Sequence, residues 1–238
     1  MDLKTLMKEV HDIDITNQQQ DMLMRDLQEI MVVNQTHNLT SIPSIELGVV
    51  RHLEDSLLGL HAFKAAPQGL YADLGTGGGF PGIPLAIMTG RNTLLVDSVK
   101  KKVVALEGVV ETLGLSDIVS GYAGRIEDLA LERGKQFSVL TARALSSLPS
   151  LLELASPLLM MNGQLICYKA RPDDEEIQTA IALEKKLGMK LVSRETFTLS
   201  DGSDRVIMVF EKIAKPKVHL PRRIGLAQKS PFKISTTC

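Results

Sequence analysis

A run of glycines is the clearest chemistry-bearing pattern in the sequence. Residues 73–84 read DLGTGGGFPGIP, between two apolar stretches, which predicts a strand, a tight turn and the start of a helix. Glycine adopts positive φ angles and lets a ligand approach the backbone closely. Nucleotide-like ligands bind at such turns in open α/β folds. Only Gly75 and Gly77 match the dinucleotide fingerprint, because Phe80 occupies the position of its third glycine.

An acidic residue follows the next predicted strand. Asp97 comes directly after the apolar residues 94–96. A carboxylate at this place can accept hydrogen bonds from ribose hydroxyls. Nicotinamide cofactors and S-adenosylmethionine both contain adenosine, so the turn and Asp97 do not distinguish between them. Asp97 could instead cap the helix expected to begin near Val99.

Further candidate residues follow the third, fourth and fifth predicted strands. Ile126 could lie against an adenine ring, and Glu127 could accept a hydrogen bond from its amino group. Arg143 and Lys169 come at the ends of two strands, where side chains face the ligand crevice of a parallel sheet. Each has a plainer alternative. Glu127 could simply be an acid in the first turn of a helix. Arg143 could form a surface ion pair, and Lys169 could lie in a solvated loop.

These residues lie between alternating strand and helix patterns. The alternation predicts an α/β fold with a parallel sheet and right-handed crossovers. The predicted strands are Leu70–Leu74, Thr93–Val96, Ile118–Ser120, Phe137–Thr141 and Gln164–Tyr168, and the helices are Ile83–Met88, Val99–Leu113, Leu148–Leu159 and an acidic segment from Asp173 to Leu187. Two last strands, 190–198 and 205–212, are separated by a short loop and should form an antiparallel hairpin.

The two ends of the chain differ from this central region. We divide the sequence into a helical extension (1–66), a central domain (67–213) and a basic tail (214–238). The extension has apolar stripes at helical spacing, including a third helix predicted from Ser44 to Ala62. Residues 212–233 contain lysines and arginines but no acid, so Arg222 and Arg223 could meet phosphate. A solvated tail is the alternative.

Composition restricts the class of protein. The 238 residues are 44% hydrophobic and 23% charged, as in a soluble globular protein. No apolar run reaches the length of a membrane span, and the acidic N-terminus is not a secretory signal. Two cysteines form no disulfide framework, and the five histidines have no metal-ligand spacing. We therefore expect a cytoplasmic protein without a metal site or a membrane partner.

Together these segments resemble the bacterial 16S ribosomal RNA guanine-N7 methyltransferases, also called RsmG or glucose-inhibited division protein B. The resemblance covers nearly the whole chain, and the FPGIP extension of the glycine turn is its most specific part. The matching segments are NLTSI (38–42), HLEDSL (52–57), DLGTGGGFPGIP (73–84), Asp97-Ser98 followed by lysines, GRIE (124–127), Arg143-Ala144, the strand end at Lys169, and the basic PRRIG and KSP (221–225 and 229–231).

The resemblance implies a fold and a reaction. The fold is that of class I S-adenosylmethionine-dependent methyltransferases, a Rossmann-like seven-stranded sheet with an antiparallel last strand and N-terminal helices. The reaction is methyl transfer from S-adenosylmethionine to N7 of a guanine in 16S ribosomal RNA. The implied partner is the small-subunit RNA or the 30S particle, and we expect a monomer. Guanine N7 carries a lone pair and no proton, so no catalytic base is needed.

The resemblance also assigns residues. Contacts to S-adenosylmethionine are expected from Gly75, Gly77, Phe80, Asp97, Ile126, Glu127 and Arg143. Arg143 is also expected to orient the substrate or the cofactor during catalysis, while Lys169, Arg222 and Arg223 would bind RNA. Two alternatives remain at this point. One is a ribosome-assembly factor with a vestigial pocket, and the other is an NAD(P)-dependent oxidoreductase.

Overall fold

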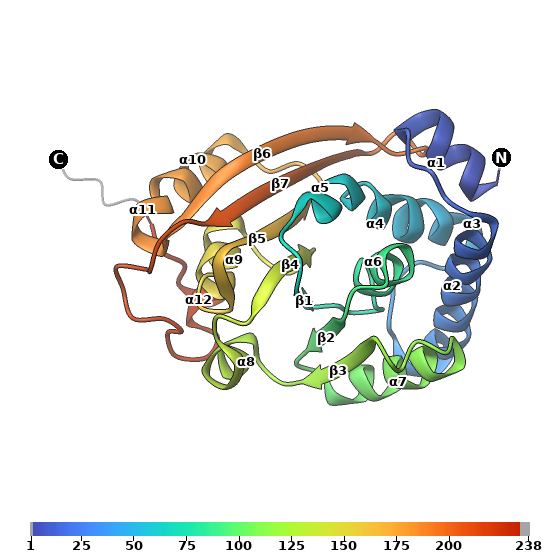
Figure 1. Cartoon of the computed structure of the whole chain (residues 1–238), viewed down its shortest axis with the longest axis horizontal. Helices are drawn as coiled ribbons and strands as arrows, with labels where there is room; N and C mark the ends of the chain where they lie inside the picture. Colours follow the sequence, from blue (N-terminus) through green and yellow to red (C-terminus); the bar gives the residue numbers. More distant parts are fainter. Residues whose placement is uncertain (1, 234–238) are drawn as a thin grey trace.

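A seven-stranded sheet organises the chain, as Figure 1 shows for the computed structural model, which describes residues 2–233. Its strand order is β3-β2-β1-β4-β5-β7-β6. The strands are β1 (Leu70–Leu74), β2 (Thr93–Asp97), β3 (Val119–Ala123), β4 (Phe137–Arg143), β5 (Leu159–Lys169), β6 (Met189–Thr198) and β7 (Asp204–Lys212). Strands β1 to β5 pair in parallel, whereas β7 runs antiparallel to both β5 and β6. The predicted closing hairpin is therefore confirmed.

Helices cover both faces of the sheet. They are α1 (Leu3–His11), α2 (Asn17–His37), α3 (Ile45–Gly48), α4 (Asp55–Leu57), α5 (Leu60–Ala65), α6 (Gly82–Thr89), α7 (Lys100–Thr112), α8 (Ile126–Arg133), α9 (Leu148–Ala155), α10 (Asp174–Ala182), α11 (Glu184–Leu187) and α12 (Leu226–Lys229), with a π-helical segment, η1 (Val49–Glu54), between α3 and α4. In Figure 1, α1 to α7 lie on one side of the sheet and α8 to α12 on the other. None of the helices in the described part of the chain is long and apolar enough for a membrane span.

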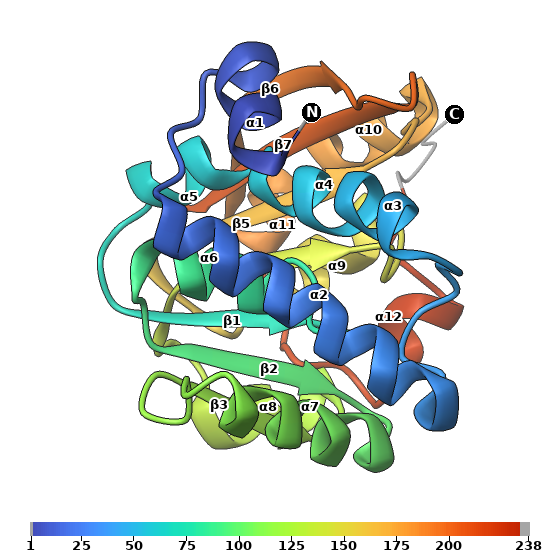
Figure 2. The same ribbon diagram turned by 90° about the vertical axis from the view of Figure 1, so that its right-hand side faces the viewer.

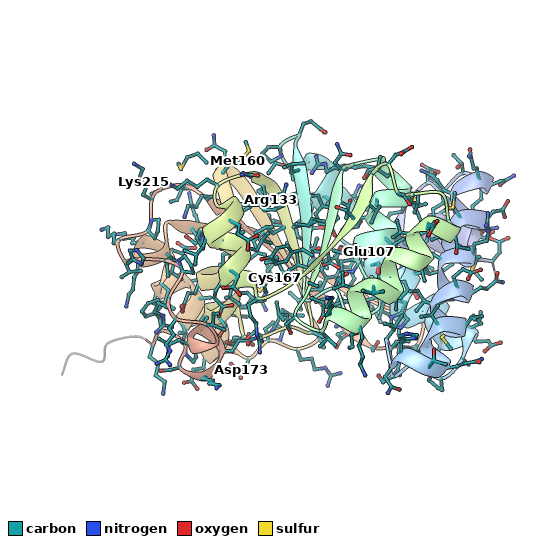
Figure 3. All side chains as sticks on the ribbon, turned by 90° about the horizontal axis from the view of Figure 1, so that it is seen from below. Glu107, Arg133, Met160, Cys167, Asp173 and Lys215 are labelled. Carbon is teal, nitrogen blue, oxygen red and sulfur yellow. The ribbon has the colours of Figure 1, made fainter. Side chains whose placement is uncertain are left out.

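Side chains that alternate between the two faces of the sheet form two apolar cores, one on each face. In β1, Tyr71 belongs to the core on the side of α2, α6 and α7, whereas Ala72 and Leu74 belong to the core beneath α8 and α9. Side chains of successive strand residues point to opposite faces of a sheet, so buried central strands are apolar on both. Figure 3 shows side chains filling the space between ribbons, with Cys167 of β5 among them. This cysteine is fully buried.

The N-terminal helices share the first core with the sheet. Leu23, Leu27 and Ile30 of α2 are fully buried in the same apolar cluster as Leu106 and Val109 of α7. In Figure 2, α2 crosses the molecule beside α6 and α7. The extension thus packs as an integral layer, while the division of the chain at residues 66 and 213 stays a prediction.

Several predicted boundaries were wrong. The helix predicted to reach Leu159 ends at Ala155, because Pro157 has no N–H to continue it and disfavours helical geometry before it. Residues from Leu159 onwards already belong to β5, and β3 begins at Val119 and extends to Ala123. The acidic helix predicted from Asp173 to Leu187 is divided at Leu183 into α10 and α11.

The predicted third helix is also interrupted. Residues 44–62 were predicted as one α-helix, but the π-helical turns of η1 separate α3 from α4. A π segment widens the helix locally and changes which backbone groups are paired, and such segments are frequent at functional sites. Here the carbonyl of Arg51 accepts a hydrogen bond from Arg143 at 2.9 Å. The irregularity therefore connects the N-terminal helices to the end of β4.

Candidate active site

The glycine turn after β1 is held from below by a buried carboxylate. Asp73 accepts hydrogen bonds from the Thr76 hydroxyl at 2.7 Å and from the backbone N–H of Gly82 at 3.1 Å. Its other oxygen accepts from the hydroxyl of Thr141 on β4 at 2.6 Å. Burial raises the pKa of Asp73, and these donors partly offset that effect. Asp73 thus ties both ends of the turn to the sheet.

Two glycines in the turn are required by its geometry. Gly75 has a φ of +69°, and a Cβ there would lie 2.6 Å from a methyl group of Leu145. A Cβ on Gly82 would lie 2.4 Å from Leu95 and 3.0 Å from the Asp73 carboxylate. A side chain at Gly75 would therefore be strained by the positive φ, and one at Gly82 would have to displace Leu95 or the Asp73 carboxylate.

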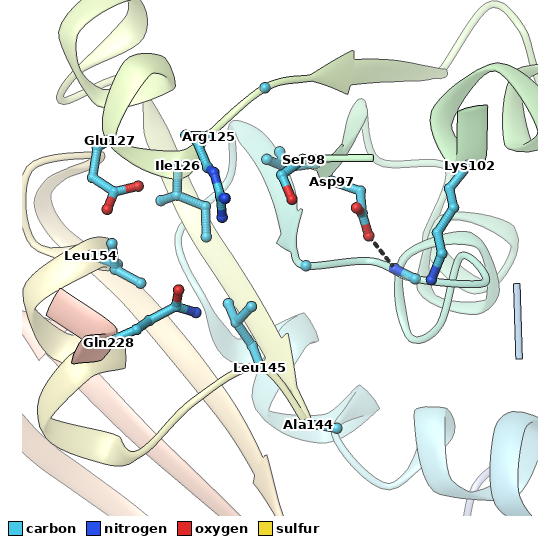
Figure 4. Close-up of a pocket in the computed structure, with 14 residues that line it drawn as sticks. Asp97, Ser98, Lys102, Arg125, Ile126, Glu127, Ala144, Leu145, Leu154 and Gln228 are labelled. Atoms are coloured by element: carbon cyan, nitrogen blue, oxygen red, sulfur yellow. Dashed lines mark hydrogen bonds between the residues drawn. The ribbon is translucent and has the colours of Figure 1, made fainter. Parts of the chain in front are cut away.

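Asp97 at the end of β2 faces this turn. One of its oxygens accepts from the backbone N–H of Gly77 at 3.2 Å, and the other accepts from the N–H of Val99 at 2.9 Å. The carboxylate therefore fixes the turn and the start of α7 together. The alternative that Asp97 is the N-cap of this helix was wrong, because Val99 is the N-cap residue of α7 and the helix has no side-chain cap. Figure 4 shows the Asp97 carboxylate at the wall of a cavity.

We call this first cavity the turn cavity. Its lining comes from the ends of β1, β2, β3 and β4, from α7, α8 and α9, and from the C-terminal segment: Gly75, Gly77, Val96, Asp97, Ser98, Lys102, Gly124, Arg125, Ile126, Glu127, Ala144, Leu145, Leu154 and Gln228. Of the predicted cofactor residues, it brings together Gly75, Gly77, Asp97, Ile126 and Glu127. Ile126 and Leu145 give it apolar surface, and Asp97 and Glu127 lie on opposite sides in Figure 4.

A second cavity, the arginine cavity, adjoins the first. It is lined by Thr40, Ser41, Ile42, Arg51, His52, Asp55, Arg143, Ala144, Tyr168, Lys169, Ala170 and Arg205. The two cavities share Ala144, directly after β4. Ala144 has a φ of +53°, which is uncommon for a residue other than glycine and is found where surrounding structure imposes it. The strand end is therefore bent sharply at the junction of the cavities.

A carboxylate holds two arginines in the arginine cavity. Asp55 accepts from Arg143 at 2.9 Å and from Arg205 through two bonds of 2.6 and 2.9 Å. The Asp55 side chain is 2% exposed, whereas those of Arg143 and Arg205 are 14% and 16% exposed. Two cations and one anion leave this group with a net positive charge. The guanidinium groups are therefore fixed in position and still reach the cavity.

His52 is a neutral member of the same group. Its Nδ1 lies 3.2 Å from Arg143, which can only donate, so Nδ1 accepts and Nε2 carries the proton towards the Thr40 hydroxyl at 2.7 Å. Burial and the charge of Arg143 lower the pKa of His52 to about 3. The imidazole stacks on Phe80, with ring centroids 4.3 Å apart. Phe80 is buried there, outside the lining of the turn cavity.

The other predicted residues lie apart from the turn cavity. Arg143 and Lys169 both line the arginine cavity, and Lys169 forms an ion pair with Glu176 at 2.7 Å. Arg222 forms a two-point ion pair with Glu153, whereas the neighbouring Arg223 is exposed. The cofactor role of Phe80 and Arg143 and the RNA role of the basic residues stay predictions.

Sequence reasoning missed several residues that line these cavities. Asp55 carried a signal, since it lies in the HLEDSL segment, but its pairing with Arg205 joins positions far apart in the sequence. Gln228 carried no signal, because an isolated glutamine in a basic tail is ordinary surface composition. Groups of three or more His, Cys, Asp or Glu side chains that could hold a metal ion are not found among residues 2–233.

The chain resembles known proteins over most of its length. The family model described as rRNA small subunit methyltransferase G matches residues 19–206. The chain belongs to this family. It is 32% identical to the ribosomal RNA small subunit methyltransferase G of Pseudothermotoga lettingae, over 85% of this chain and 88% of that protein. The protein of the same name from Alkaliphilus metalliredigens is 35% identical, over 93% of each chain.

The solved structures support the fold. An O-methyltransferase from Bacillus cereus, in complex with S-adenosylhomocysteine, superposes with a TM-score of 0.57 at 19% identity, over 88% of this chain and 97% of that one. The protein is thus a methyltransferase of the small-subunit rRNA methyltransferase G family that uses S-adenosylmethionine. Neither the oxidoreductase nor the vestigial-pocket alternative receives support from these comparisons.

The turn cavity has the groups that this cofactor requires. Its glycine backbone permits close approach, Asp97 follows the second strand, and Ile126 and Leu145 offer apolar surface to a purine ring. Glu127 can accept from an exocyclic amino group with the oxygen that the chain leaves free. The donor set of the cavity therefore fits an adenosyl group.

Proposed function

We propose that this methyltransferase modifies N7 of a guanine in small-subunit ribosomal RNA, with the adenosyl group in the turn cavity and the guanine in the arginine cavity. The meeting of the two cavities at Ala144 carries the proposal, because methyl donor and acceptor must lie in direct contact. The matching of the family model supports the RNA as substrate. Because that substrate is a ribosomal RNA, we expect the protein to act in the cytoplasm.

The groups around the arginine cavity suit an acceptor that has no proton to lose. S-adenosylmethionine, when bound, supplies a methyl group on a positively charged sulfur. Guanine N7 attacks through its lone pair, so no residue has to serve as a base. His52 is neutral and fully engaged with Arg143 and Thr40, which agrees with a positioning role for the imidazole. Holding the reactants in line is worth up to about 7–11 kcal/mol.

Arg143 is the residue best placed to orient the guanine. Its guanidinium is fixed by Asp55 and by the carbonyl of Arg51. Arginine makes two-point contacts to O6 and N7 of guanine in many protein–nucleic-acid complexes. Here N7 must stay free for the methyl group, so we assign to Arg143 a contact with O6 or with the neighbouring phosphate. Arg51 and Lys169 at the rim would meet further phosphates.

A labelling experiment tests the function. Small ribosomal subunits and their naked RNA, both from cells that lack this enzyme, are incubated with the protein and S-adenosylmethionine labelled in the methyl group. We expect one labelled guanine, identified as N7-methylated by strand scission with aniline after borohydride reduction. A flat rate between pH 6 and 8 should accompany it, since no titrating base takes part. Label at another atom, or no label in either substrate, would contradict the proposal.

A further inference from the structure

The C-terminal segment folds back over the turn cavity. After β7, the chain reaches the cavity at α12, where the backbone N–H of Gly225 donates to Glu127 at 2.7 Å. Gln228 on the same short helix lines the cavity. Figure 4 shows its carboxamide directed into the cavity, on the side of Ile126 and Glu127 and across from Asp97. The tail thus supplies one wall of the proposed cofactor site.

Buried contacts hold this wall in place. Arg222 pairs with Glu153 of α9 at 2.6 and 2.5 Å, and the Glu153 side chain is 2% exposed. The Ser150 hydroxyl donates to the carbonyl of Ala227 at 2.7 Å, in a fully buried position. Arg222 also lies over the ring of Phe232, 4.0 Å from its centroid. The first two contacts anchor the tail to α9 on the N-terminal side of Gln228, and the third joins Phe232, beyond Gln228, to the same arginine.

We propose that Gln228 is an adenine-binding residue and that the tail, through it, completes the cofactor site. A carboxamide offers both a hydrogen-bond acceptor and donors, which is the complement of the amino group and ring nitrogens of adenine. Glu127 accepts from Gly225 with one oxygen and keeps the other for the ligand. The inference rests on the proposed placement of the adenosyl group in the turn cavity.

The basic tail then has two faces with different tasks. Arg222 points inward and serves as the anchor, whereas Arg223 and Lys229 are exposed. Positive charge alone therefore does not explain why the tail is held so firmly. In a solvated tail, the uncharged Gln228 would not line the cavity, and the backbone N–H of Gly225 would not donate to the buried Glu127.

Binding of S-adenosylhomocysteine by calorimetry tests the inference in the full-length protein. The substitution Gln228→Ala should raise the Kd for S-adenosylhomocysteine about tenfold, which is the usual effect of losing one or two ligand hydrogen bonds. Lys229→Ala is the matched control, since it changes the next exposed residue of α12 and should leave the Kd unchanged. The melting temperature of both variants should stay that of the wild type, because neither side chain is buried.

A modified ligand separates a direct contact from a general effect on the tail. In the wild-type protein, an S-adenosylhomocysteine analogue with purine in place of adenine lacks the 6-amino group and should bind more weakly. In Gln228→Ala this loss should be smaller, because one partner of the amino group is already gone. Equal losses in both proteins, or a Gln228→Ala Kd like that of the control, would overturn the role of Gln228.

The placement of the adenosyl group is tested separately. Asp97→Ala should weaken binding whether or not Gln228 contributes. If Asp97→Ala binds normally, the placement in the turn cavity is wrong. If only Gln228→Ala binds normally, the placement stands and the inference about the tail fails.

Discussion

The turn cavity and the arginine cavity share Ala144 but differ in how their polar groups are built. In the turn cavity, Asp97 accepts hydrogen bonds from two backbone N–H groups, those of Gly77 in the glycine turn and of Val99 before α7. In the arginine cavity, Asp55 joins Arg143 and Arg205, which come from β4 and β7. The carboxylate of one site is thus held by backbone groups, and that of the other by charged side chains.

This difference matters for the chemistry. A cradle of backbone groups suits a cofactor that is the same in every reaction cycle. A network of charged side chains, fixed in advance, suits the orientation of a nucleic-acid base and its phosphates. The comparison predicts that damage to the turn cavity appears in cofactor affinity, and that damage to the arginine cavity appears in stability and in the rate of methyl transfer.

The largest expected effect comes from Asp55. Asp55→Ala would leave Arg143 and Arg205 without their common partner in a largely buried setting. Losing one member of a buried ion pair costs about 3–5 kcal/mol, and the partial exposure of both arginines places this variant at the lower end. Denaturant unfolding should report a free energy of unfolding lower by about 3 kcal/mol. A loss below about 1 kcal/mol would mean that water replaces Asp55 without difficulty.

Replacing Asp97 should have a smaller effect, which appears in cofactor affinity. Asp97→Ala removes a carboxylate that is expected to accept from the ligand and that also holds Gly77. Loss of hydrogen bonds to a charged group costs about 1.5–3 kcal/mol, which is about a 10- to 150-fold rise in the Kd for S-adenosylmethionine. Glu111→Ala, which removes an exposed carboxylate of α7 outside the lining of the cavity, is the matched control. Calorimetric titration of both variants measures the difference.

A third carboxylate extends the contrast with Asp55. Asp26 of α2 is fully buried, and neither of its oxygens has a hydrogen-bond partner among the described residues. Burial raises the pKa of Asp26 well above its usual value. Asp26→Ala should therefore stabilise the protein at neutral pH by about 1–2 kcal/mol, because an unsatisfied buried group costs about that amount.

The sign of the pH dependence for Asp26 follows from its raised pKa. Between the unfolded and folded pKa values, the folded state binds a proton that the unfolded state has released, so the contribution of Asp26 to stability falls as pH rises. The advantage of Asp26→Ala over the wild type should grow from about pH 4 upward and then level off above the folded pKa. Unfolding curves at several pH values would reveal it. An advantage that shrinks with rising pH would contradict this account.

Much of the fold could be predicted from the sequence, because local patterns determine it. Strand and helix periodicity indicated the parallel strands and the closing hairpin, and the DLGTGGGFPGIP turn, through Gly75 and Gly77, lines the turn cavity. Local patterns did not reveal the π-helical turns of η1, since π and α segments have similar apolar spacing. They also placed Leu159 in a helix, although Pro157 marked the boundary.

The candidate site was predictable only where it is local. Asp97 and Glu127 lie next to strand ends and were found, and both line the turn cavity. The partners of Asp55 depend on which strands lie side by side, which one sequence does not specify. Gln228 depends on how the tail folds back, and that is decided by the buried pairing of Arg222 with Glu153.

The most direct test of the central claim measures binding and chemistry separately in one variant, Arg143→Ala. Arg143 lies in the arginine cavity and outside the lining of the turn cavity. We expect its Kd for S-adenosylmethionine to stay within about threefold of the wild type, while single-turnover methyl transfer to the small subunit falls about 100- to 1,000-fold, as for loss of a preorganised positioning group. A Kd that rises as much as in Asp97→Ala, or wild-type transfer, would contradict the division of labour between the two cavities.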